Sequence, residues 1–232
     1  MLHNFHEGEV LLVNKPAGWT SFDVVNKIKY ATKAKVGHAG TLDPLATGLM
    51  IICTGKFTKK LTEFTGFDKS YEGTIYVGAT TPSYDAETPV SETFDISNIS
   101  EEDIINAAKK LTGKIAQMPP IFSAIKKNGK KAYEAARQGK EVKLDPRNVE
   151  IFQFDITRIE LPEIDFEVSC SKGTYIRSLA HDLGKLLNSG AYLKFLNRTR
   201  IGDFYLKDAL ELNALIQYIK EHPELCEKPK NS

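Results

Sequence analysis

The stretch Gly37-His-Ala-Gly-Thr-Leu-Asp-Pro-Leu-Ala-Thr-Gly48 is a polar loop that carries three glycines, one acid and one imidazole. Glycine lets a backbone approach another group closely and adopt conformations that other residues avoid. The apolar run Leu49–Cys53 follows directly and has the length of a buried strand. We therefore expect Asp43 at the mouth of a buried strand, held from behind by the core.

Asp43 also has an ordinary structural explanation. An Asp before a Pro commonly starts a turn or caps a helix, with the Pro as the first helical residue. For an isolated Asp-Pro pair this explanation would be preferred. The nearby His38, the richness in glycine and two distant stretches described below favour a functional site instead.

The composition is that of an ordinary globular protein. The chain has 232 residues, of which 41% are hydrophobic and 26% charged, enough for one large domain or two small ones. No apolar run approaches the ~20 residues that span a bilayer, and the first residues do not resemble a secretory signal. The three cysteines show no CxxC spacing, which indicates free thiols and no structural zinc. We expect a cytoplasmic protein that binds no metal or membrane.

The net charge of +1 hides an uneven distribution. The segment 126–147 holds eight basic residues and three acids, whereas the segment 79–103 holds seven acids and no Lys or Arg. Such an asymmetry suits a polyanion bound on one side, although a solvated charged loop would look the same. We expect the basic segment, with Arg198 and Arg200, to contact a nucleic acid backbone.

Hydrophobic periodicity and capping signals predict the following elements. Strands are expected at 9–13, 49–53, 69–78, 149–159, 166–170 and 195–204, and helices at 20–32, 57–64, 100–111, 132–138, 174–187 and 208–220. The buried helical positions are expected to include Ile104, Ile105, Ala108 and Leu111, and later Ile176, Leu179, Ala180, Leu183, Leu186 and Leu187.

These elements do not follow a strict β-α-β rhythm, and several strands succeed one another directly. The pattern favours an α+β fold with a mixed, largely antiparallel sheet flanked by helices. We expect one domain over residues 1–232, with a basic insertion at about 122–148 and a helix and polar tail at about 208–232.

Several stretches together resemble the TruB family of tRNA pseudouridine synthases. The match begins with Gly37-His38 and Gly40–Gly48, and continues in Lys69-Ser-Tyr71-Glu and Cys170-Ser-Lys-Gly-Thr-Tyr-Ile-Arg177-Ser. Weaker matches are Lys15-Pro-x-Gly18, Ser123-Ala-Ile-Lys and Leu196-Asn-Arg-Thr. The resemblance extends from Val10 to about Phe204, almost the whole chain.

The resemblance implies isomerisation of uridine to pseudouridine in the T-arm of tRNA, at position 55, by a monomer without a cofactor. It also assigns roles to individual residues. Asp43, Tyr71 and Arg177 would be catalytic, and His38, Lys15, Leu196, Tyr175, Lys126, Lys130 and Arg198 would contact the substrate. Two features depart from the family: the further RNA-binding PUA domain common in it is expected to be missing, and Asn197 stands where an Arg is usual.

The reaction breaks a C–N glycosidic bond, turns the base and makes a C–C bond, so it needs a carboxylate nucleophile in a dry pocket. Asp43 would attack either the sugar carbon or the uracil ring. Arg177 would pair with Asp43 and keep it ionised, and Tyr71 would stack on the base and move a proton. Taken singly, Arg177 fits an exposed helix residue, Tyr71 and Leu196 fit core residues, and His38 fits an exposed loop.

Two other classes of protein remain as alternatives. A non-catalytic RNA-binding module could keep the same scaffold, but binding alone would not need a buried acid and arginine pair. A glycosidase would also use a carboxylate nucleophile, but that chemistry usually needs a second acid close by, and the loop holds only Asp43.

Overall fold

The computed structural model describes residues 4–122, 126–127, 130–131 and 144–228. The chain forms two compact units, one made of Met1–Tyr71 with Asn197–Ser232 and the other of Glu72–Leu196. Strands β4 (Lys69–Val77) and β12 (Ala191–Ile201) give residues to both units. The prediction of a single catalytic domain stays a prediction, and each unit is described by itself.

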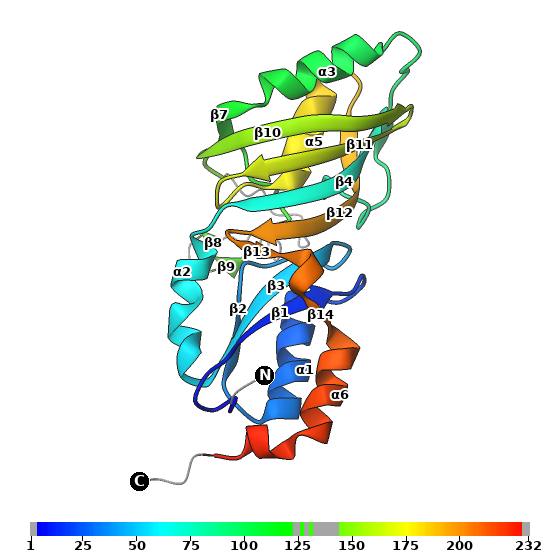
Figure 1. Cartoon of the computed structure of the whole chain (residues 1–232). Coiled ribbons are helices and arrows are strands. Elements are labelled where there is room, and N and C mark those ends of the chain that lie inside the picture. The colour runs from blue at the N-terminus through cyan, green and yellow to red at the C-terminus, as the bar shows by residue number, and fades with distance from the viewer. Residues whose placement is uncertain (1–3, 123–125, 128–129, 132–143, 229–232) are drawn as a thin grey trace. The chain divides into compact units, whose positions relative to one another are not determined.

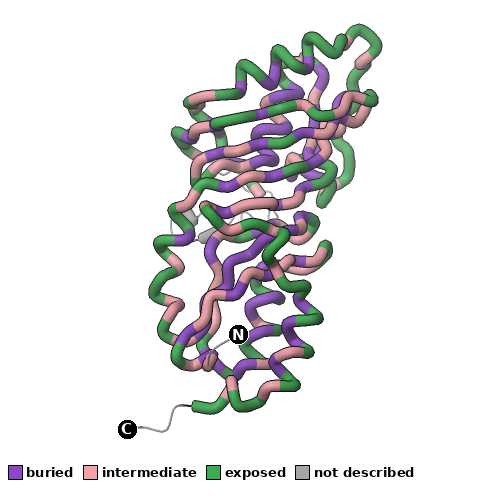
Figure 2. The backbone as a smooth tube through the Cα atoms, in the orientation of Figure 1, coloured by how far each residue is buried: buried purple, intermediate pink, exposed green. Residues whose placement is uncertain are grey.

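The first unit is built on the strand order β14–β1–β3–β12 (Figure 1). The bounds of its strands are β1 Val10–Lys15, β2 Val36–Ala39, β3 Thr47–Thr54, β13 Phe204–Tyr205 and β14 Leu210–Glu211. β3 pairs antiparallel with β1 and β2 and parallel with β12, so it lies inside the sheet. Its residues from Gly48 to Thr54 are all buried (Figure 2).

The helices of the first unit are α1 (Ser21–Thr32), η1 (Gly55–Lys60), α2 (Leu61–Thr65), η2 (Leu206–Asp208), α6 (Leu212–Glu221) and η3 (Pro223–Cys226). α1 and α6 lie side by side (Figure 1). The helix α1 begins with a capping box, in which Thr20 and Asp23 bond each other's backbone. A cluster of Leu49, Ile51, Cys53 and neighbouring apolar residues forms the core behind the loop that carries Asp43.

The second unit is built on the order β12–β4–β11–β10–β7. Its strands are β5 Ala79–Thr80, β6 Glu92–Thr93, β7 Gly113–Gln117, β8 Lys126–Lys127, β9 Lys130–Lys131, β10 Arg147–Glu160 and β11 Glu163–Cys170. The pairs of β10 with β11 and with β7 are antiparallel. The helices α3 (Glu101–Lys110) and α5 (Ile176–Leu186) pack in this unit, and Figure 1 shows α5 along one face of the sheet.

The predicted fold class is confirmed, because the sheet is mixed, largely antiparallel and flanked by helices. The predicted alternation in β4 is also confirmed: every second residue from Lys69 to Val77 is buried. The helices expected at 20–32 and 100–111 are confirmed as α1 and α3, and each begins with a capping box, at Thr20 and at Ser100. These features depend on contacts between near neighbours in the sequence, which a local pattern records well.

Several local predictions are wrong. Ile105 and Leu186 are exposed, since α3 buries Ile104, Ala107 and Ala108 and Leu186 is the last residue of α5. The strand expected at 195–204 begins at Ala191 and is interrupted at Gly202, where φ is +54°.

Two helix starts also differ from the prediction. Thr174 does not cap α5, because its hydroxyl donates to the Ser171 carbonyl and Tyr175 precedes the helix. Asp208 ends η2, and α6 begins only at Leu212. The helix expected at 132–138 lies outside the described residues.

Within the described part of the chain, no helix is long and apolar enough to cross a bilayer. The same residues contain no group of three or more His, Cys, Asp or Glu side chains that could hold a metal ion.

Candidate active site

The loop that carries Asp43 connects β2 to β3 in the first unit. Asp43 is half-buried, and its carbonyl accepts a hydrogen bond from the Ala46 amide at 3.1 Å. Asp43 therefore starts a turn, as its ordinary structural explanation says, but no helix follows Pro44. The turn leaves the carboxylate on a short bend directly before the buried strand.

Ser21, the first residue of α1, holds the backbone next to Asp43. Its hydroxyl donates to the Leu42 carbonyl at 3.0 Å and accepts from the Leu42 amide at 2.8 Å. The amide and the carbonyl of Leu42 are thus both fixed to α1 by the Ser21 side chain. This attachment fixes the backbone from which the Asp43 side chain projects.

Lys15, expected to contact the substrate, holds the backbone of the Asp43 loop. The side chain is fully buried, and Nζ donates to the carbonyls of Pro16, Trp19 and Pro44 at 3.0, 2.5 and 3.1 Å. Burial lowers the pKa of Lys15 to about 8, although the negative charge of Asp43 favours the charged form. A buried cation therefore acts on the Asp43 carboxylate from within the protein.

Arg198 is a second buried cation beside this loop. Only 1% of the residue is exposed, and the guanidinium donates from Nε to the Leu49 carbonyl at 2.7 Å and from Nη2 to the Gly40 carbonyl at 3.1 Å. It also shares a side-chain hydrogen bond with Tyr71. The expected contact of Arg198 with an RNA backbone does not agree with this burial, because the guanidinium faces the protein interior.

Gly48 and Asn197 bring β12 close to the end of the loop. Gly48 has a φ of +108°, and a Cβ there would lie 2.4 Å from the Arg198 carbonyl oxygen, so only glycine fits. Asn197 accepts a hydrogen bond from the Thr47 hydroxyl at 3.0 Å. The residue that departs from the family pattern thus helps to hold the loop.

Tyr71 is buried on β4 and His38 is half-buried on β2. Burial lowers the pKa of His38, which favours the neutral ring. The Nδ1 atom of His38 is buried and has no hydrogen-bond partner within the described part of the chain. A buried polar atom without a partner calls for an explanation, and the expected RNA contact of His38 stays a prediction.

Arg177 lies in the second unit and is 5% exposed, so it is not an ordinary surface residue of a helix. Its Nε lies 3.6 Å from Oδ2 of Asp85, and its Nη1 donates to the Ser83 carbonyl at 3.2 Å. Asp85 in turn accepts from the Ser83 hydroxyl at 2.5 Å and from the Glu87 amide at 2.9 Å. These contacts hold the guanidinium in a fixed orientation.

Asp85 was not among the residues predicted for the site. In the sequence it is one acid in the polar, Pro-containing stretch 80–89, and such a pattern is too common to select one residue. The ion pair with Arg177 spans 92 positions of the chain and becomes visible only in the folded unit.

Tyr175 and Leu196, two further expected substrate contacts, also belong to the second unit. The Tyr175 amide donates to Oε1 of Gln117 at 2.8 Å, and Nε2 of Gln117 donates back to the Tyr175 carbonyl at 3.1 Å. Gln117 therefore fixes the start of α5, two residues before Arg177. Leu196 is 7% exposed, which fits a pocket wall and a core residue equally well.

The first unit thus carries Asp43, Lys15, His38, Tyr71 and Arg198, and the second carries Tyr175, Arg177 and Leu196. The two remaining expected contacts, Lys126 and Lys130, belong to the paired strands β8 and β9. Their side chains lie outside the described part of the structure.

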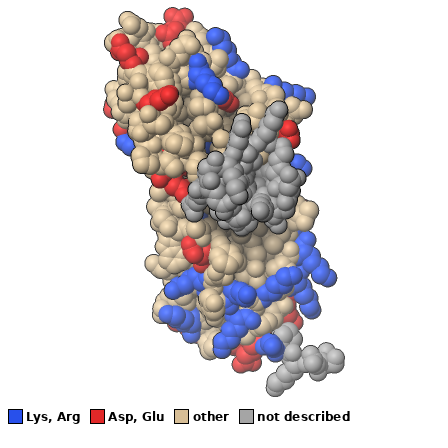
Figure 3. Space-filling model, turned by 180° about the vertical axis from the view of Figure 1, so that it is seen from behind, with Lys and Arg blue, Asp and Glu red and all other residues tan. Residues whose placement is uncertain are grey.

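Exposed lysines gather on the first unit. Seven of them fall between residues 24 and 60, where Asp43 is the single acid: Lys27, Lys29, Lys33, Lys35, Lys56, Lys59 and Lys60. Figure 3 shows Lys and Arg side chains over one face of this unit. This second basic stretch was not predicted from the sequence, where only the segment 126–147 stood out as basic.

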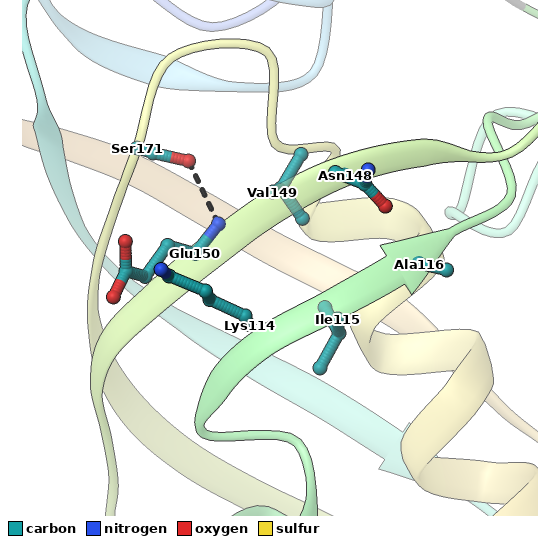
Figure 4. A pocket seen from close by; sticks show the side chains of 7 residues that line it. All are labelled: Lys114, Ile115, Ala116, Asn148, Val149, Glu150 and Ser171. Atoms are coloured by element: carbon teal, nitrogen blue, oxygen red, sulfur yellow. Dashed lines mark hydrogen bonds between the residues drawn. The ribbon is translucent and has the colours of Figure 1, made fainter.

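A separate groove of about 490 Å³ lies in the second unit (Figure 4). It is lined by Lys114, Ile115, Ala116, Asn148, Val149, Glu150 and Ser171. The Glu150 amide donates to the Ser171 hydroxyl at 2.9 Å across one side of it. None of the expected site residues lines this groove, so it does not belong to the candidate active site.

Comparison with known proteins gives close relatives over the whole chain. A protein of Flavobacterium johnsoniae is 56% identical over 214 residues, which cover 89% of this chain and 93% of the relative. A protein of Phocaeicola vulgatus is 49% identical, covering 94% and 96%, and one of Chlorobaculum tepidum is 48% identical, covering 96% and 95%. All three are named tRNA pseudouridine synthase B.

Solved structures with the same fold are described as a Cbf5-Nop10-Gar1 complex and an H/ACA RNP bound to a substrate RNA containing 2'-deoxyuridine. Their TM-scores are 0.72 and 0.71 at 27% and 25% identity, and each match covers 97% of this chain. This chain spans 58% and 57% of the length of those two solved chains.

The family model described as TruB family pseudouridylate synthase (N terminal domain) matches residues 27–176. This range contains the Asp43 loop, Tyr71 and the start of the segment that carries Arg177. Together with the relatives above, the match shows that the chain belongs to the TruB family of pseudouridylate synthases.

Proposed function

We propose that this pseudouridine synthase acts on the T-loop uridine at position 55 of tRNA, with Asp43 as the nucleophile. The observation that carries the proposal is the construction of the Asp43 loop. Its backbone is fixed by Ser21, and the buried cations Lys15 and Arg198 hold carbonyls on it. A fixed, ionised carboxylate is what attack on a nucleoside requires.

The reaction is an isomerisation, so no electrons are exchanged and no group is lost. Asp43 attacks either the sugar carbon or the uracil ring, the C–N bond breaks, and the freed base turns. The base then forms a C–C bond to the same sugar carbon and releases the carboxylate. The positive charge of Lys15 favours the ionised form of Asp43 before the attack.

The other site residues would assist these steps. Tyr71 would stack on the turned base and move a proton off the sugar or the ring. The ring nitrogen that is freed from the sugar takes up a proton, so the isomerisation gains and loses none overall. Arg177 would orient the carboxylate through its planar guanidinium, which Lys could not reproduce. His38 would offer its unpartnered Nδ1 to the RNA, and Leu196 would help to keep water out of the pocket.

The target base must leave a folded RNA arm before it can react, at a cost of a few kcal/mol. Contacts between lysines and phosphates can offset this cost. Lys126 and Lys130 are proposed contacts of this kind, and the exposed lysines of residues 24–60 add positive charge to the unit that carries Asp43. The expectation of a cytoplasmic monomer stays a prediction.

The proposal is tested by incubating the purified protein with an unmodified T-arm stem-loop and mapping pseudouridine at single-nucleotide resolution. We expect product at the T-loop uridine alone. Product at a different uridine would overturn the assignment of position 55. Tight binding without any product, also with full-length tRNA, would favour the non-catalytic binding module.

The nucleophile is tested separately with Asp43→Asn, which keeps the shape of the side chain but removes its charge. We expect turnover to fall to background while the dissociation constant for tRNA stays within about threefold, because a neutral amide cannot attack. The exposed Asp203→Asn is the matched control and should turn over normally. Turnover by Asp43→Asn in a clean preparation would exclude Asp43 as the nucleophile.

A further inference from the structure

Arg198 is one of the largest fully buried side chains of the protein, although it carries a charge. Transfer of a guanidinium from water into the interior costs several kcal/mol unless its donors are satisfied. The partners named above are two carbonyl oxygens and a phenol, and none of them is a carboxylate. The arrangement therefore differs from an ordinary buried ion pair.

The two carbonyls lie at opposite ends of the segment 40–48, which leads from β2 into β3, carries Asp43 and is here called the nucleophile loop. Gly40 follows β2 directly and begins the loop, whereas Leu49 lies on β3 just after it. One rigid, planar group therefore spans the loop from its entry to its exit. Lysine has one nitrogen at the end of a flexible stem and cannot reproduce this fork.

The third partner connects the same guanidinium to Tyr71. Arginine can only donate hydrogen bonds, so the phenol oxygen of Tyr71 must accept this one. The hydroxyl hydrogen of Tyr71 then has to point away from Arg198. Arg198 thus selects the direction in which Tyr71 can donate its proton.

We propose that Arg198 is a positioning residue that fixes the nucleophile loop and the Tyr71 hydroxyl relative to each other. It acts through Asp43 and Tyr71 and touches neither the substrate nor the RNA backbone. The consequence for catalysis rests on the proposed function of these two residues. That one guanidinium holds the loop at both ends follows from the hydrogen bonds alone and does not depend on the proposed function.

The test compares Arg198→Lys, Arg198→Met and Arg198→Ala with the wild type. The matched control is Arg158→Lys, a partly exposed arginine of the other unit that pairs with Asp165 and Glu160. Single-turnover rate and dissociation constant for T-arm RNA are measured separately. We expect the rate to fall about 100-fold in Arg198→Lys, the effect of a small misplacement of reacting groups, with binding unchanged within about threefold.

Rescue of activity by added guanidinium ion distinguishes a positioning role of Arg198 from a purely structural role. Arg198→Ala leaves a space that added guanidinium ion can enter, and the ion can donate to the same three acceptors. We expect the single-turnover rate of this variant to rise with guanidinium concentration below the denaturing range, while Arg158→Ala shows no gain. No rescue of a folded Arg198→Ala variant would overturn the positioning role.

Hydrogen exchange provides a readout that does not depend on activity. In Arg198→Lys, peptides that cover residues 37–49 should exchange faster than in the wild type, while Arg158→Lys should leave them unchanged. Unchanged protection of these peptides would overturn the proposal, even if the wild type were inactive on T-arm RNA. Weaker RNA binding at an unchanged single-turnover rate would also overturn it, because that result would make Arg198 a backbone contact.

Discussion

The side chains of Arg177 and Asp85 are 6% and 8% exposed and face each other inside the second unit. Removing one partner of a buried pair leaves the other charge uncompensated, which costs about 3–5 kcal/mol. We expect Asp85→Ala to lower the free energy of unfolding by this amount in urea denaturation. Activity should fall as well, because Arg177 would lose the contact that orients its guanidinium.

An exposed pair provides the comparison for this prediction. Lys194 and Glu163 form an ion pair on the surface of the same unit, and such pairs contribute about 0–1 kcal/mol. Glu163→Ala should therefore change the free energy of unfolding only slightly. If Asp85→Ala proved as mild as Glu163→Ala, the pair with Arg177 would have no structural role.

The pKa of Lys15 gives stability a characteristic dependence on pH. It is about 8 in the folded chain, against an ordinary value of 10.5, because the side chain is buried. The unfolded chain therefore binds this proton more tightly, and the contribution of Lys15 to stability rises as pH increases from about 8 to 10.5. The penalty for burying the charge is fully present below about pH 8.

This dependence is measured as the difference in free energy of unfolding between the wild type and Lys15→Met. We expect the free energy of unfolding of the wild type to rise relative to that of Lys15→Met between about pH 8 and pH 10. Other groups titrate equally in both proteins and cancel. A difference that stayed constant over this range would show that the Lys15 ammonium is not destabilised by burial.

At the scale of elements, α1 does more than cover the sheet, because its first residue holds the loop before Asp43. Ser21→Ala would leave the amide and the carbonyl of Leu42 without their partner. An unsatisfied buried group costs about 1–3 kcal/mol, so we expect a loss of about that size or somewhat more in free energy of unfolding. Turnover should fall too, because the backbone beside Asp43 loosens.

Thr65→Ala, at the end of α2, is a suitable control for Ser21→Ala. The Thr65 hydroxyl also donates to a carbonyl, that of Leu61, but the bond is exposed and water can replace it. We expect a change within about 0.5 kcal/mol. Equal losses in Thr65→Ala and Ser21→Ala would show that the contact between α1 and the loop is unimportant.

At the scale of the whole molecule, a net charge of +1 conceals separate basic and acidic stretches. Replacement of Lys126, Lys127, Lys130 and Lys131 by Gln should weaken tRNA binding and flatten its dependence on salt. The slope of log K against log salt is negative, and each lost phosphate contact makes it less negative by about 0.7–0.9. The measurement is a series of binding isotherms over salt concentration.

The matched control replaces four exposed lysines of the second unit, Lys109, Lys110, Lys114 and Lys185, by Gln. Both variants change the net charge by the same amount, so a general effect of charge would weaken binding equally. We expect only the first variant to change the salt slope. Equal slopes for the wild type and the first variant would remove the basic insertion from the interface.

Local patterns predicted much of the fold, and the residues that they selected for the site stay a prediction. The two capping boxes, the alternation in β4 and the loop before β3 all depend on residues that are neighbours in the sequence. The α+β class followed from the order of these elements. The predictions that are wrong, such as the burial of Ile105 and Leu186, concern helix positions whose exposure depends on what packs against them.

The sequence alone selected the residues that are proposed to carry the chemistry: Asp43, the only acid of its loop, Tyr71 in an alternating strand and Arg177 near a helix start. Only the tertiary structure decided what surrounds them. Arg198 meets the Gly40 carbonyl across 158 positions, and Arg177 meets Asp85 across 92. The alternation of apolar and polar residues in a strand shows that a side chain points inward. It does not show which groups the side chain contacts there, because these come from distant segments of the chain. For this reason Arg198, which was expected to meet RNA, lies inside the protein and donates hydrogen bonds to the Gly40 and Leu49 carbonyls on either side of Asp43.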